Sequence, residues 1–201
     1  MKQLLLDIQP AQPQTFSNFI TGQNNEALAN IHGLLNVKGD CQFIYLWGPA
    51  GSGKTHLLNA AKRHGAAVAD DVHLLSEEAQ IELFNRYNEL KASGNVIIAA
   101  GLHSPTQMGL RNDLATRLAW GLVYQLHPLT DAEKAEALKN HAKERGMNLP
   151  NEVIAYCLRY LRRDLPTLMS ILNALDEWSL TEKKPVTVPM LKKLLQLDLG
   201  I

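Results

Sequence analysis

The chain has 201 residues, enough for one α/β core and a smaller helical unit. Lys plus Arg (20) equals Asp plus Glu (20), and this zero net charge argues against a generally basic nucleic-acid binder. No apolar run reaches the roughly 20 residues that span a bilayer, and Asp7 interrupts the N-terminus too early for a secretory signal. We therefore expect a cytoplasmic protein in which Cys41 and Cys157 are reduced, small hydrophobic side chains.

Strand-like and helix-like patterns alternate through the first two thirds of the chain. A Gln- and Pro-containing segment over residues 1–14 comes first and has no regular pattern. Apolar runs predict strands over 41–47, 66–69, 95–101 and 122–126. Helical spacing predicts helices over 24–35, 54–64, from 76 to about 90 with an apolar face at Ile81, Phe84, Tyr87 and Leu90, and over 113–120. This alternation is typical of an α/β fold with a parallel sheet.

From residue 129 onward the pattern is helical only. Thr130 and Glu133 form a capping-box pattern that begins a helix ending near Arg145, with Gly146 as its stop. Further helices are predicted over 150–162 and 164–182, and after Thr187. We therefore place a nucleotide-binding core over 15–128 and an all-helical subdomain over 129–201.

A glycine-rich loop separates the first strand from the second helix. It consists of Gly48-Pro49-Ala50-Gly51-Ser52-Gly53-Lys54-Thr55 and satisfies G-x-x-x-x-G-K-[ST] in full. Its backbone N–H groups and the N-terminus of the following helix favour an anion. Lys54 is predicted to reach the β- and γ-phosphates of ATP or ADP, and the Thr55 hydroxyl to ligate Mg²⁺. The alternative, a chance glycine-rich turn, is weakened by the strand and the helix on either side.

Two acidic residues follow the second predicted strand. Asp70 is interpreted as the outer-sphere partner of Mg²⁺, and Asp71 as the residue that orients or deprotonates an attacking water. The strand is short and alanine-rich, so the alternative is that the pair caps a turn.

Several segments resemble the bacterial DnaA initiator ATPases. Phe16-Ser17-Asn18-Phe19 with Gly22 and Asn25 looks like their N-terminal box, and residues 70–75 look like their acidic box. Residues 117–122 look like the box that carries their arginine finger. The resemblance runs from about Thr15 to the C-terminus. It implies the AAA+ fold, a P-loop core followed by a helical lid over residues 129–201.

The resemblance assigns roles to two arginines. It makes Arg117 a finger that reaches a neighbouring subunit's γ-phosphate, which accelerates hydrolysis by about 10³–10⁵; a surface salt bridge is the alternative. It makes Arg163 the lid residue that senses bound phosphate in cis, although Arg159 and Arg162 leave that assignment ambiguous by a turn. The predicted nucleotide-binding set is Gly48, Pro49, Ala50, Gly51, Ser52, Gly53, Lys54, Thr55, His56 and Arg163.

The N-terminus is similar to the short motif by which proteins dock on the DNA sliding clamp, the β subunit of DNA polymerase. The predicted clamp-binding residues are Gln3, Leu4, Leu6 and Ile8. An extended terminal peptide can enter a groove, whereas hydrophobic N-termini also pack on their own core. The sequence ends soon after the lid, so we expect no helix-turn-helix. The resemblance is therefore closest to a short regulatory member that inactivates the initiator and associates with the nucleoid through the clamp.

The sequence departs from the family pattern in two places. Only the fourteen residues from His56 to Ala69 separate Thr55 from Asp70, where the family carries an extra strand and helix of roughly 30 residues. That strand would be a sheet edge, so we predict a four-stranded parallel sheet. In initiators the same stretch contacts single-stranded DNA, so we expect no direct sequence-specific DNA binding by the core. At the strand tip where the family has a polar sensor, Leu102 is a poor substitute, and the sensor is His103 or Ser104 or is absent, which predicts weak self-hydrolysis.

These observations favour a regulator of chromosomal replication initiation. We expect it to bind ADP or ATP, dock on the clamp and promote ATP hydrolysis by the DnaA initiator, with no membrane contact. A self-contained P-loop ATPase such as a helicase loader, and a nucleotide-stabilised adaptor, stay open, as does a homo-oligomer.

Overall fold

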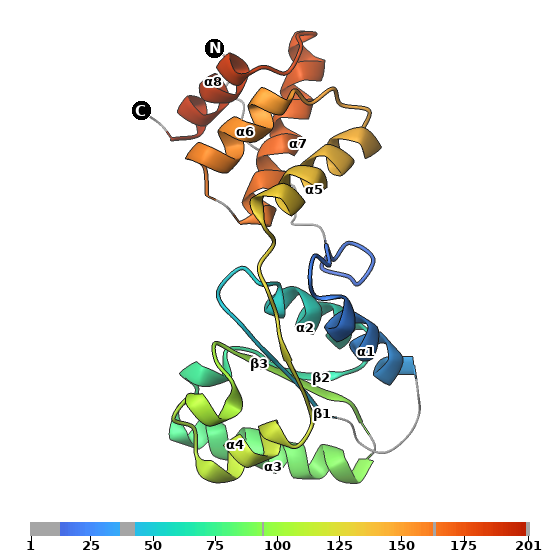
Figure 1. Ribbon diagram of the computed structural model, residues 1–201, viewed down its shortest axis with the longest axis vertical. Coiled ribbons are helices and arrows are strands. Elements are labelled where there is room, and N and C mark those ends of the chain that lie inside the picture. Colours follow the sequence, from blue (N-terminus) through green and yellow to red (C-terminus); the bar gives the residue numbers. More distant parts are fainter. Residues whose placement is uncertain (1–12, 37–42, 94, 163, 200–201) are drawn as a thin grey trace. The chain divides into compact units, whose positions relative to one another are not determined.

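The computed structural model describes residues 13–36, 43–93, 95–162 and 164–199 (Figure 1). The chain divides into two compact units, with the boundary between Pro128 and Leu129. The first unit contains the sheet, and the second is helical.

The described part of the first unit has a four-stranded sheet. Its strands are β1 (Phe43–Trp47), β2 (Ala67–Ala69), β3 (Ile97–Gly101) and β4 (Leu122–Gln125). They pair in the order β2-β3-β1-β4, and every pairing is parallel. The predicted four-stranded parallel sheet is therefore confirmed. The two central strands are almost entirely buried, because a parallel sheet is covered on both faces.

Helices cover both faces of this sheet (Figure 1). Successive strand side chains point to opposite faces, so Ile44 and Leu46 pack in one cluster while Phe43 and Tyr45 pack in another. The first cluster includes Leu57. It lies against α1 (Asn25–Asn36) and α2 (Lys54–Arg63). The second lies against α3 (Glu77–Ser93) and α4 (Asn112–Ala119). The result is a three-layered αβα core.

One prediction about α3 was wrong in detail. Helical spacing placed Ile81 on the apolar face with Phe84 and Tyr87, but Ile81 is 41% exposed. Phe84, Tyr87 and Leu90 do pack in the second cluster, the one that contains Phe43 and Tyr45. The spacing of apolar residues identifies the apolar face of a helix, but it does not show which residues of that face a neighbouring element buries.

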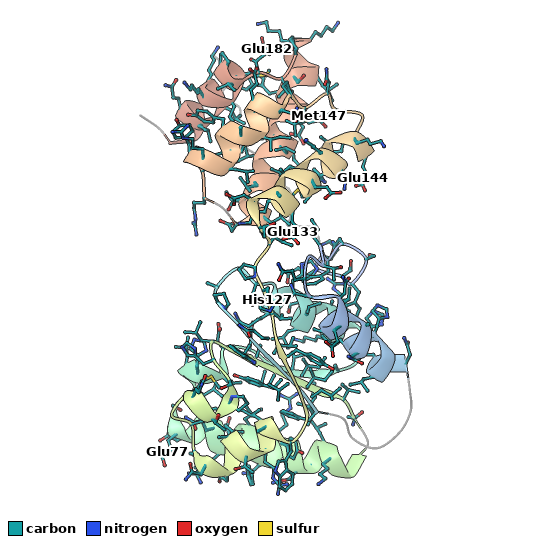
Figure 2. The ribbon with its side chains drawn as sticks, viewed as in Figure 1. Glu77, His127, Glu133, Glu144, Met147 and Glu182 are labelled. Carbon is teal, nitrogen blue, oxygen red and sulfur yellow. The ribbon has the colours of Figure 1, made fainter. Side chains whose placement is uncertain are left out.

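The second unit is built from four helices among the described residues: α5 (Asp131–Glu144), α6 (Asn151–Tyr160), α7 (Leu165–Glu182) and α8 (Val188–Leu199). The capping box at the start of α5 is present: the Thr130 N–H donates to Glu133 Oε2 at 2.7 Å, and the Glu133 N–H donates to Thr130 Oγ1 at 3.2 Å. Glu133 is labelled in Figure 2. Arg145 Nε donates to Asp176 Oδ2 at 2.8 Å and joins α5 to α7. None of the described helices is long and apolar enough to cross a membrane.

Candidate functional site

The glycine-rich loop turns tightly between β1 and α2. Gly53 has a φ of 95°, a left-handed conformation that glycine adopts without the steric cost of a side chain. A side chain at Gly48 would collide with the backbone carbonyl of Leu126. Both positions therefore require glycine for a physical reason that the motif alone does not give.

The first turn of α2 offers unpaired donors next to this loop. The N-cap residue of α2 is Gly53, which makes no side-chain capping bond. The N–H groups in the first turn of a helix have no intrahelical partner. Ser52 Oγ is buried and has no hydrogen-bond partner among the described residues. Donors and a hydroxyl gathered at a helix N-terminus suit the oxygen atoms of a phosphate group.

The ammonium group of Lys54 is folded onto the loop. Its Nζ donates to the carbonyl oxygens of Gly48 at 2.7 Å and Pro49 at 3.0 Å. Burial lowers the pKa of Lys54 below its ordinary value, while the negative charges of Asp70 and Asp71 oppose that shift. The carbonyl oxygens thus occupy the donors that an anionic ligand would use.

The two residues predicted to hold magnesium lie together. The Thr55 hydroxyl donates to Asp70 Oδ2 at 2.7 Å, and Asp70 Oδ1 accepts from the Asp71 N–H at 2.9 Å. One group comes from α2 and the other from the end of β2. A hydroxyl and a carboxylate placed next to each other in this way could bind Mg²⁺ either directly through their oxygen atoms or through its bound water molecules.

Asp71 is oriented differently from Asp70. It has a φ of 46°, a left-handed conformation uncommon for a residue other than glycine. Its Oδ1 lies 4.0 Å from His73 Nδ1, and its side chain is largely exposed. The structure therefore brings Asp70, and not Asp71, into contact with Thr55.

The segment before α1 packs against α2 beside the loop. His56 Nε2 lies 2.8 Å from the carbonyl oxygen of Thr15, and the Phe19 ring lies 5.2 Å from the His56 ring. Burial lowers the pKa of His56, and the hydrogen bond to Thr15 acts in the opposite direction. These contacts were not predicted from the sequence, although the closely spaced Phe16 and Phe19 could have suggested that the segment packs on the core.

The side chain of Arg117 rests on aromatic rings. It extends from the last turn of α4, and its guanidinium carbon lies 4.5 Å from the ring centre of Trp120. The rings of Tyr87 and Phe84, both on α3, are at 5.7 and 5.8 Å. Within the described ranges no carboxylate forms an ion pair with Arg117. Among the described residues, the surface salt bridge that was the alternative is therefore not observed.

Models of two known families match separate parts of the chain. The model of the bacterial DnaA ATPase domain matches residues 11–68, and the model named Hda, lid domain, matches residues 131–195. The chain is a DnaA-family AAA+ protein. Its lid places it close to Hda.

Solved structures agree with this assignment. Domain III of the replication initiation protein DnaA from Thermotoga maritima superposes with a TM-score of 0.74 at 23% identity, over 93% of this chain and 98% of that chain, and so supports the fold. DnaA from Aquifex aeolicus bound to AMPPCP gives 0.67 at 26% identity, over 81% of this chain and 65% of that chain. The RuvB Holliday junction branch migration motor of Thermotoga maritima gives 0.61 at 15% identity, over 93% and 72%, and shows the shared fold alone. The chain thus spans about two thirds of the length of the Aquifex aeolicus protein.

The end of β3, where the resemblance predicted a sensor, accepts a hydrogen bond from β1. Tyr45 Oη donates to the carbonyl oxygen of His103 at 3.0 Å, and Leu102 beside it is 37% exposed. The assignment of a sensor to His103 or Ser104 stays a prediction.

Several predicted site residues of this DnaA-family chain lie outside the described residues. They are Arg163 and the four predicted clamp contacts Gln3, Leu4, Leu6 and Ile8. Arg162 and Arg159 were the other candidates for the role assigned to Arg163. Arg162 Nε lies 3.6 Å from Asp164 Oδ2, and the guanidinium of Arg159 lies over the ring of Tyr160.

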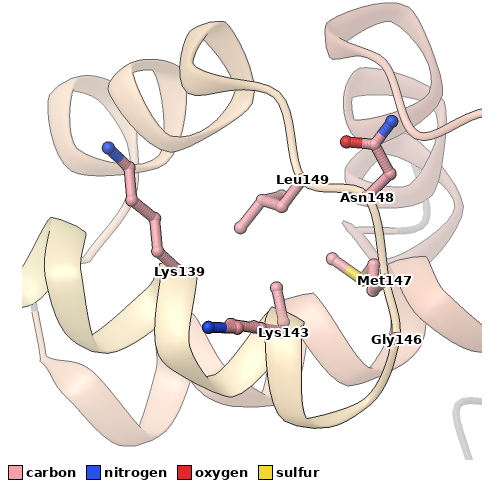
Figure 3. Close-up of a pocket in the computed structure, with 7 residues that line it drawn as sticks. Lys139, Lys143, Gly146, Met147, Asn148 and Leu149 are labelled. Carbon is pink, nitrogen blue, oxygen red and sulfur yellow. The ribbon is translucent and has the colours of Figure 1, made fainter.

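The lid unit has a shallow pocket of about 350 Å³ at the end of α5 (Figure 3). Lys139 and Lys143 line one side, and Met147 and Leu149 the other (Figure 3). None of the predicted site residues lines it.

Proposed function

We propose that this DnaA-family protein is a regulator of replication initiation that promotes ATP hydrolysis by the DnaA initiator. In this proposal the core over 15–128 holds ADP or ATP, and residues 129–201 form a helical lid subdomain. The segment over 1–14 docks on the sliding clamp through Gln3, Leu4, Leu6 and Ile8. The observation that carries the proposal is the guanidinium of Arg117, which is held on aromatic rings with no carboxylate partner among the described residues.

Nucleotide binding follows from the loop. Phosphate oxygens would replace the carbonyl oxygens of Gly48 and Pro49 as acceptors for Lys54, and the orphan N–H groups at the start of α2 would bind the same phosphates. Thr55 and Asp70 would hold Mg²⁺, which neutralises phosphate charge when bound. The AMPPCP bound by the DnaA of Aquifex aeolicus supports this part of the proposal.

The accelerated hydrolysis takes place in the partner's site and not in this chain's own. Arg117 would reach the γ-phosphate of an ATP bound to the initiator, where a positive charge stabilises the transition state by about 10³–10⁵ in rate. Within the chain's own site, Asp71 would orient a water and Arg163 would contact the phosphates in cis. An apolar Leu102 near the strand tip supports weak turnover there.

The test is ATP hydrolysis by the initiator, measured with and without clamp loaded on DNA. We expect Arg117→Ala to abolish the stimulation while nucleotide binding and clamp retention are unchanged. Lys54→Ala should remove nucleotide binding, and Gln3→Ala should remove clamp retention. Stimulation by Arg117→Ala at the level of the unmodified chain would refute the proposal.

One observation favours a second candidate, a self-contained P-loop ATPase such as a helicase loader. Thr55 and Asp70 already lie together at the chain's own loop, as its own hydrolysis would require. Fast ATP turnover by the purified chain alone, insensitive to Arg117→Ala, would support this candidate over the regulator.

A further inference from the structure

The guanidinium of Arg117 lies against three aromatic rings, those of Phe84, Tyr87 and Trp120. One of them, Tyr87, contacts the sheet. Tyr87 is buried, and its ring packs edge-on against Phe43 of β1 with the ring centres 4.9 Å apart. Phe84 lies one turn earlier on α3, and Trp120 directly follows α4 with 63% of its surface exposed. We call Phe84, Tyr87 and Trp120 the aromatic seat. It runs from the buried core to the surface, and Arg117 lies on it.

A neighbouring arginine of the same region is bound in a different way. Arg111, which precedes α4, places Nη2 3.1 Å from Asp113 and Nη1 3.5 Å from Glu77. Its N–H donors are therefore engaged by carboxylates. The guanidinium of Arg117 contacts aromatic rings, whereas that of Arg111 contacts carboxylates. The N–H donors of Arg117 can therefore still bind an anion, and those of Arg111 are already used.

Aromatic rings hold a guanidinium without using its hydrogen-bond donors. The cation is attracted to the faces of the rings, whereas its five N–H groups lie in its own plane. An anionic ligand can then be bound without first breaking an ion pair. The ammonium of Lys91 lies 6.0 Å from the Trp120 ring, so a second positive charge flanks the same indole.

The residue after Trp120 packs closely against β1. A side chain at Gly121 would collide with the backbone carbonyl of Phe43. The backbone that follows Trp120 therefore lies directly against the start of β1.

We infer that Trp120 is a positioning residue: it holds Arg117 at the exposed end of α4 with its donors free for the phosphate of a partner's nucleotide. This inference rests on the proposed function. Arg117 loses less conformational freedom on binding because the seat has already restricted it. The indole is predicted to act on the rate of the stimulated reaction rather than on the affinity between the proteins.

The experiment titrates the full chain against the ATP-bound initiator in the presence of clamp on DNA. We expect Trp120→Leu to lower the maximal stimulated rate by about 2- to 30-fold, the range of one cation–π contact, with little change in the half-saturating concentration. Trp120→Phe keeps a ring and should restore most of the rate. The matched control is Tyr156→Leu, which removes a ring under Lys192 in the second unit (5.4 Å) and should leave the rate unchanged.

A spectroscopic measurement tests the seat without the partner. The emission of Trp120 is obtained as the difference between the unmodified chain and Trp120→Phe. We expect Arg117→Met to change this difference spectrum, because the cation next to the indole is lost. An unchanged spectrum would overturn the seat.

The outcomes separate the two proposals. If Arg117→Ala abolishes stimulation but Trp120→Leu stimulates like the unmodified chain, the inference about Trp120 is wrong and the proposed function stands. If Arg117→Ala still stimulates fully, the proposed function is wrong, and the role of Trp120 falls with it. A fall in affinity alone for Trp120→Leu would make Trp120 a docking contact and overturn its positioning role.

Discussion

The side chain of Asn24, just before α1, forms hydrogen bonds with the backbone of His127, just after β4. Its Nδ2 donates to the carbonyl oxygen of His127 at 2.9 Å, and its Oδ1 accepts from the His127 N–H at 2.8 Å. Asn24 is 4% exposed. One amide side chain therefore satisfies both backbone groups of a residue 103 positions away. We predict that Asn24→Ala destabilises the first unit.

The magnitude follows from these two bonds. Each hydrogen bond contributes about 0.5–1.5 kcal/mol, and alanine leaves the two His127 backbone groups with only water as a partner. Because His127 itself is exposed, water can reach part of this site. We therefore expect a loss of about 1–3 kcal/mol in the free energy of unfolding.

The chain offers a matched control in Asn18. Its side chain also accepts from a backbone N–H (Thr15, 2.9 Å) and donates to a backbone carbonyl (Pro13, 3.0 Å), but it is exposed and its partners are close in sequence. Asn18→Ala should cost less than about 0.5 kcal/mol, as for most exposed sites. The measurement is urea unfolding of the full chain followed by tryptophan fluorescence. Equal effects of the two substitutions would refute the reasoning, because burial would then not decide the cost.

Three further predictions follow from single groups. Burial lowers the pKa of Lys54, and a bound polyphosphate would raise it again, so ADP binding should take up protons at alkaline pH and weaken as the pH rises. Calorimetry in buffers of different ionisation enthalpy measures this proton uptake, and Lys54→Met should remove it. Burial raises the pKa of Cys157 to about 11, so iodoacetamide at pH 8 should modify it far more slowly in the native chain than in urea, as peptide mapping would show. Gly121→Ala should destabilise the first unit by about 1–3 kcal/mol in urea unfolding, whereas Gly33→Ala, with no atom within 4 Å, should stabilise α1 slightly.

Local patterns determined much of this protein. The P-loop spacing, the capping box at Thr130 and the four apolar strand segments were predictable, because each depends on residues close together in sequence. Helical periodicity located α1 to α8, with ends that differ by one to three residues.

Contacts between distant segments were decided only by the tertiary structure. The strand order, the pairing of Asn24 with His127 and the aromatic seat under Arg117 join segments far apart in the chain. Whether Arg117 meets a carboxylate or a ring depends on how α3 and α4 pack on the sheet. Periodicity shows which face of a helix is buried but not which residue of another helix it meets, so the sequence could name the arginine and not what holds it.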